Sequence, residues 1–183
     1  MRQEPDPGED FLDALAGRLT GMPGRPVAVD LSAEDAWELV TRLDSALDAD
    51  GVQTRMVLGA ACPTTTEAIA QFVTAMQLPY RASRSWEDFL GELGERPVSQ
   101  RQCLVVTDAC ALLRHESFDR WRELVGGVCG GPYCMGGGWT TLVLADREPA
   151  WREWVFRPAA DTARRSGWEL PMLRGSAGAS GFP

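Results

Sequence analysis

The chain has 183 residues, 44% of them hydrophobic and 24% charged, a composition typical of a globular domain with one full core. Its 26 acidic and 18 basic residues give a net charge of −8 at pH 7. Because an acidic protein repels phosphate backbones, this balance predicts no direct nucleic-acid partner and favours a basic protein partner. All the basic residues are arginine, so the lysine of a P-loop is absent.

No window of the sequence is apolar enough for a transmembrane helix, and the acidic N-terminus does not read as a signal peptide. We therefore expect a cytoplasmic protein without a membrane partner. The five cysteines are an odd number, which predicts free thiols rather than a disulfide framework.

The predicted elements alternate between strands and helices along the chain. Residues 1–25 are acidic and predicted to be partly disordered, with a short amphipathic helix around Leu15. Ser32 is the predicted N-cap of the first main helix, whose inward face is expected to include Trp37. Gly126-Gly127 is expected to stop a helix that begins near Glu116. The predicted strands span 26–32, 55–61, 103–109 and 139–145, with a helix in each connection.

Short apolar strands joined through helices predict an α/β fold with a parallel sheet of three to four strands covered by helices. We expect residues 26–146 to form a single domain. Residues 147–183 carry six arginines and several tryptophans, and are predicted to be a helical extension with a flexible tail.

The sequence contains few groups suited to chemistry. One loose cysteine pair, Cys129 and Cys134, and one histidine do not make a zinc site, so no metal and no cofactor are expected. Asp108 follows a predicted strand, and His115 would have to serve any histidine-dependent mechanism. A small α/β enzyme using these two residues remains an alternative, but the main expectation is a protein that is not an enzyme.

Residues 85–94 form a predicted helix with two distinct faces. Ser85 is the expected N-cap, and Trp86 begins an apolar face that also includes Phe89. Asp88 and Glu92, four residues apart, project from the other side. This acidic side is either an ordinary solvated surface or a surface that docks into a partner.

The order of elements from about Arg55 to Asp146 resembles the barstar family, the intracellular inhibitors of barnase-type ribonucleases. The similar stretches are the strand MVLGA, the pair Leu78-Pro79 with the loop and helix after it, and the segments CLVVTDACALL and WTTLVLAD. The resemblance implies a barstar-like core at 55–146, to which residues 26–50 add a β-α unit.

The resemblance also implies a function and a binding surface. Members of the barstar family fill a nuclease active site with an acidic helix and the loop before it. The resemblance therefore implies that this chain acts as a ribonuclease inhibitor, as an immunity protein or antitoxin does. The spacing from Pro79 places the family's first acidic residue at Glu87 but its second at Gly91, where a charge is missing. A diverged interaction scaffold without nuclease inhibition is the second alternative. The expected partner-binding residues are Tyr80, Arg81, Arg84, Trp86, Glu87, Asp88, Gly91, Glu92 and Glu123.

Overall fold

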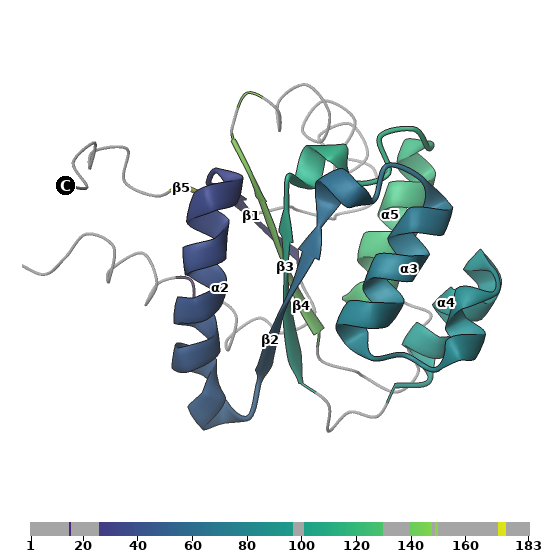
Figure 1. Cartoon of the computed structure of the whole chain (residues 1–183), viewed down its shortest axis with the longest axis horizontal. Coiled ribbons are helices and arrows are strands. Elements are labelled where there is room, and N and C mark those ends of the chain that lie inside the picture. The colour runs from purple at the N-terminus through teal and green to yellow at the C-terminus, as the bar shows by residue number, and fades with distance from the viewer. Residues whose placement is uncertain are drawn as a thin grey trace, which may run out of the picture.

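Figure 1 shows the computed structural model of the chain. The structure describes Leu15, residues 26–96, 101–129, 140–147 and 149, and the backbone of 172–174.

Five parallel strands form one sheet in the order β2-β3-β4-β1-β5. β1 is therefore an interior strand, with β4 on one side and β5 on the other, although it comes first in the chain. Along β1, β3 and β4 nearly every residue is buried, as expected for strands covered on both faces. The strands are β1 (Pro26–Asp30), β2 (Gln53–Leu58), β3 (Gln102–Thr107), β4 (Thr140–Asp146) and β5 (Met172–Arg174).

Helices cover the two faces of the sheet unequally, with α2 on one side and α3, α4 and α5 on the other (Figure 1). Each of these four helices begins at a serine or threonine whose side chain accepts a hydrogen bond from a backbone N–H of the first turn. The helices are α2 (Ala33–Leu47), α3 (Thr65–Met76), α4 (Trp86–Gly94) and α5 (Phe118–Val128), with short 3-10 turns η1 (Asp48–Asp50), η2 (Gly59–Ala61), η3 (Tyr80–Ser83) and η4 (Ala109–Ala111).

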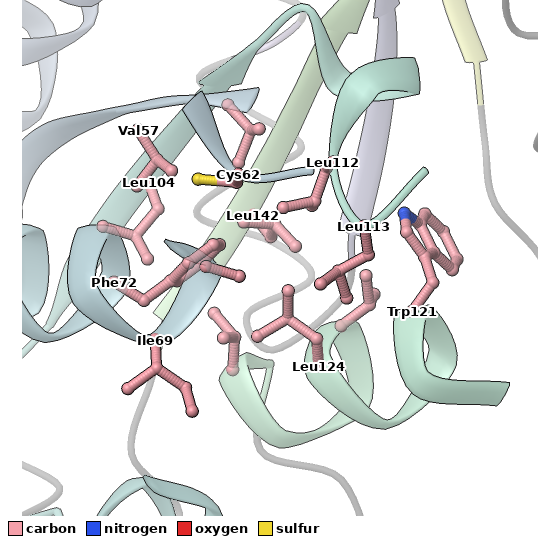
Figure 2. Close-up of a cluster of buried hydrophobic side chains, with 14 of the residues drawn as sticks. Val57, Cys62, Ile69, Phe72, Leu104, Leu112, Leu113, Trp121, Leu124 and Leu142 are labelled. Carbon is pink, nitrogen blue, oxygen red and sulfur yellow. The ribbon is translucent and has the colours of Figure 1, made fainter. Parts of the chain in front are cut away.

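The apolar core has two parts, one on each face of the sheet. The larger part lies under α3, α4 and α5 and includes Phe72, Leu104 and Trp121, which are fully buried (Figure 2). The smaller part lies between α2 and the sheet and includes Leu15 and Leu43. This arrangement holds α4 on the outer side of the larger core.

The α/β class and the parallel sheet are confirmed, and all four predicted strands are present. The predicted number of strands was too low, because β5 is a fifth strand. The domain boundaries stay a prediction, and most of 1–25 and 147–183 lies outside the described residues. No helix in the described residues is long and apolar enough to cross a membrane.

Two local predictions were wrong. Trp37 is 59% exposed, because Ala36 takes the inward position on that turn of α2. Gly126 and Gly127 lie inside α5, which continues to Val128 because that side chain is buried in the core. Residues 26–50 do add a fourth strand, as predicted: β1 lies beside β4, next to the contiguous strands β2, β3 and β4, and β5 pairs along its other edge.

Candidate functional site

The predicted binding segment forms an outer corner of the molecule. η3 and α4 follow α3 directly, and α4 packs against α3 and α5 (Figure 1). Ser85 begins α4, since its hydroxyl accepts a hydrogen bond from the backbone N–H of Asp88 at 3.0 Å. The structure therefore confirms the N-cap that the sequence predicts.

Trp86 attaches α4 to α5 and is only 6% exposed. Its indole Nε1 donates a hydrogen bond to Oε2 of Glu123 at 3.0 Å, and Nη1 of Arg120 donates to the same oxygen at 3.1 Å. The Arg120 guanidinium also lies 4.9 Å from the Trp86 ring centre, a cation–π contact. Trp86 and Glu123 are thus brought together, but their hydrogen bond joins α4 to α5 within the protein and does not form a partner-binding surface.

Arg81 joins η3 to the end of α4. Its guanidinium forms ion pairs with Glu92 and Glu95, at 3.2 Å for Nη2 to Glu95 Oε2. The hydrogen bond to Glu92 and the charge of that carboxylate raise the pKa of Arg81. The side chain of Glu92 is 11% exposed and its charge is paired with Arg81, so Glu92 is poorly placed to contact a partner.

The other predicted residues lie on the outside of this corner, and we call them the η3–α4 face: Tyr80, Arg84, Glu87, Asp88 and Gly91. Tyr80 is 80% exposed. Arg84 and Glu87 form no ion pair within the described residues. A Cβ at Gly91 would contact nothing within 4 Å, so this position is an open part of the surface.

The alternative catalytic residues are not joined in the described structure. Asp108 begins η4 with φ +45°, and His115 is an exposed residue whose backbone N–H donates to the carbonyl of Pro63. No hydrogen bond between these two side chains is present among the described residues. Groups of three or more metal-ligating side chains are likewise not found in this part of the chain.

Thiol chemistry is disfavoured as well. Burial raises the pKa of Cys62 and of Cys103 to about 12. Burial, followed by the charge of Asp146, raises the pKa of Cys110. These thiols are protonated at neutral pH, and a protonated thiol is a poor nucleophile.

The carboxyl edge of the sheet was considered only at Asp108 by the sequence argument. Asp30 ends β1 beside Asp146 at the end of β4, where the two strands pair in register. The Asp146 carboxylate accepts hydrogen bonds from the backbone N–H groups of Cys110 at 2.8 Å and Arg147 at 2.7 Å. The available sequence signal was an aspartate at the end of each of two buried strands, where parallel sheets bind ligands.

No protein-family model matches the chain, and no curated protein matches it. Solved structures of similar fold are the ADP form of the Aeropyrum pernix ORC2 protein (14% identity, TM-score 0.64), Cdc6p from Pyrobaculum aerophilum (16%, 0.65) and Drosophila ORC bound to DNA (14%, 0.52). The alignments cover 95%, 96% and 91% of this chain and 48%, 46% and 40% of those chains. This chain therefore spans less than half the length of each of them, and at these identities the likeness is one of fold alone.

These neighbours overturn the barstar interpretation. The solved structures named above are ORC and Cdc6 proteins, not ribonuclease inhibitors. The predicted inhibitor, immunity-protein and antitoxin functions are wrong, because each followed from the barstar resemblance. The prediction of no direct nucleic-acid partner is contradicted as well, because a protein of similar fold is bound to DNA.

One of these neighbours was solved with ADP, so the fit of a nucleotide to this chain can be tested. A P-loop is a glycine-rich loop that follows a strand, opens a helix and carries a lysine. Here only Leu31 and Ser32 separate β1 from α2, neither is glycine, and the chain has no lysine. The first turn of α2 instead carries Glu34 and Asp35, whose charge repels phosphate. The residues present do not fit a nucleotide phosphate.

Proposed function

We propose that this chain is a non-catalytic binding domain that contacts a protein partner through the η3–α4 face. The observation that carries the proposal is the contrast between the two sides of this corner. On the inner side, Trp86 is fixed by its hydrogen bond to Glu123, and the exposed Arg81 is fixed at the surface by ion pairs with Glu92 and Glu95. On the outer side, Tyr80 is 80% exposed and Arg84 has no ion pair within the described residues.

A surface held rigidly before binding loses less conformational entropy when it binds. Tyrosine and arginine are also among the residues that contribute most to protein interfaces. Glu87 and Asp88 add negative charge beside Arg84, so a partner with charges of both signs would complement the face. The cytoplasm stays the predicted compartment for this interaction.

The absence of catalysis in this proposal is supported by two features of the described residues. The thiols of Cys62, Cys103 and Cys110 are held in the protonated form. Asp108 and His115 lack the mutual hydrogen bond that an acid–base pair uses.

The test compares two double variants that change the same kinds of residue on opposite sides of the protein. Tyr80→Ala/Glu87→Arg alters the η3–α4 face, and Trp37→Ala/Glu38→Arg alters an exposed aromatic and an exposed acid on α2. Partners are recovered from an extract of the source cell with each protein and quantified by mass spectrometry. We expect a protein recovered with the wild type to be lost with the first variant and retained with the second. Equal recovery with both variants would refute the role of this face.

DNA is a second candidate partner, favoured by the fold neighbour that is bound to DNA. Arg84, Arg114 and Arg147 are exposed and have no ion pair within the described residues, so they could contact phosphates. Titration with a fluorescent DNA duplex at low and physiological salt distinguishes the two candidates. Saturable binding that weakens steeply with salt would make DNA the partner instead of a protein.

A further inference from the structure

The beginning of α2 is closed by its own residues. Ser32 Oγ donates a hydrogen bond to Oδ2 of Asp35 at 2.6 Å and accepts one from the Asp35 backbone N–H at 3.2 Å. The backbone N–H of Ala36 donates to the carbonyl of Ser32 at 2.9 Å. An anion at a helix N-terminus is bound by such N–H groups. In this helix the Ser32 hydroxyl has taken the Asp35 donor, and the Ala36 bond to the Ser32 carbonyl is the first bond of the helix itself.

The neighbouring strand ends close the same edge from the side. The backbone N–H of Leu31 donates to the carbonyls of Val29 and Asp146, each at 3.1 Å. The carboxylate of Asp146 in turn receives the N–H groups of Cys110 and Arg147. Three backbone donors beside β1 are therefore bound to oxygens of the chain itself.

Four carboxylates gather at this edge, with Arg147 as a cation directly after β4, so the local charge also opposes a phosphate group. Asp30 and Asp146 end adjacent strands, and Glu34 and Asp35 lie in the first turn of the helix that follows β1. Nucleotide phosphates carry several negative charges, and in P-loop proteins lysine and magnesium offset them. The chain has no lysine to do so.

We infer that this chain works without a nucleotide: the carboxylate of Asp146 and the side chain of Ser32 occupy backbone donors at the edge where the fold would hold phosphates. The carboxyl edge of the sheet then keeps one conformation with or without nucleotide. ATP and ADP therefore do not regulate the binding of this chain to a partner. The absence of nucleotide regulation of partner binding rests on the proposed function, whereas the absence of nucleotide binding at this edge does not.

The test follows backbone amide resonances of the full chain by NMR during titration with magnesium and ADP, and then with ATP. The Aeropyrum pernix ORC2 protein is the positive control for ADP, measured by calorimetry under the same conditions. We expect no saturable shift of the Leu31, Asp35 and Cys110 amides at millimolar nucleotide, and no change in the unfolding temperature. Saturable shifts of these amides would overturn the inference.

Two variants check that the cap has the structural role argued for it. Ser32→Ala removes the side-chain partner of Asp35, so the unfolding temperature should fall, whereas Glu34→Ala should leave it nearly unchanged. Equal effects of the two variants would contradict the closed cap. Nucleotide binding at the edge would not affect the η3–α4 face, and failure of partner binding would not open the edge, so the two proposals fail separately.

Discussion

Gly59 and Gly91 should respond in opposite ways to replacement by alanine. A Cβ at Gly59 would lie 2.4 Å from the carbonyl oxygen of Thr107 and 2.5 Å from that of Asp108. Both atoms are backbone, at the point where η2 meets η4, so they cannot rotate away. Inserting a methyl group into a filled space costs about 1–3 kcal/mol, and a contact with fixed backbone lies at the upper end, so we expect Gly59→Ala to cost about 3 kcal/mol.

Gly91 is the matched control because it lies within α4 and a Cβ there would contact nothing within 4 Å. Alanine is favoured over glycine in a helix by about 0.5–1 kcal/mol, so Gly91→Ala should stabilise the protein by that amount. For a chain of this size, about 1 kcal/mol shifts the unfolding temperature by roughly 2–4 °C. Gly59→Ala should therefore unfold roughly 6–12 °C below the wild type, and Gly91→Ala slightly above it.

The assay is unfolding by heat and by urea, followed by far-ultraviolet circular dichroism. A Gly59→Ala protein as stable as the wild type would show that η2 and η4 are not in close contact. A clearly destabilised Gly91→Ala protein would show that this position is covered, which would also remove it from the η3–α4 face.

Three further predictions concern single contacts. Trp86→Phe removes a hydrogen bond to a carboxylate and part of a cation–π contact, so it should cost about 2 kcal/mol in urea unfolding, whereas Trp37→Phe at an exposed site should cost almost nothing. Hydrogen bonds from Thr65 lower the pKa of Glu116, so the ionised carboxylate stabilises the folded protein. This stabilisation is complete above the unfolded pKa of roughly 4.3, and it is lost as the pH falls through the lower pKa of the folded state. Glu116→Gln should then be less stable than the wild type at pH 7 and equal to it at the acidic end of a pH series of unfolding curves, and a constant difference at every pH would contradict this. Cys62 and Cys103 should resist alkylation at pH 8 until the protein is denatured, as peptide mass spectrometry would show, and rapid labelling of either in the native protein would contradict the raised thiol pKa.

Strands β1, β3 and β4 were predictable because each is a largely apolar run that is buried on both faces, whereas the order of the strands was not predictable. Local pattern says where β1 begins and ends, but only its pairing with β4 and β5 shows that it is an interior strand. The barstar resemblance rested on the order of elements after residue 55, so it placed β1 as a fourth strand but gave no sign of a fifth. β5 was missed because Met172–Arg174 has only three residues, too few to show a period.

The candidate site was predicted in part. Helical spacing placed Trp86 on the apolar face and Ser85 at the cap, and the structure has both. Spacing could not show that Arg81 neutralises Glu92, because the pair joins a loop to a helix through the tertiary fold. For the same reason Trp37 was misplaced: a helix with one apolar side chain too many must expose one, and the choice depends on the sheet beneath it.

The interior position of β1 also affects how the chain can fold during its synthesis. β1 leaves the ribosome well before its partners β4 and β5, which are encoded after nearly all of the described core. Until they emerge, an apolar strand has both edges unpaired, and the pairing that completes the sheet closes a very long loop of chain. Contacts so distant in sequence slow folding and leave the nascent chain prone to aggregation, so this protein should depend on chaperones more than a helical bundle of equal length.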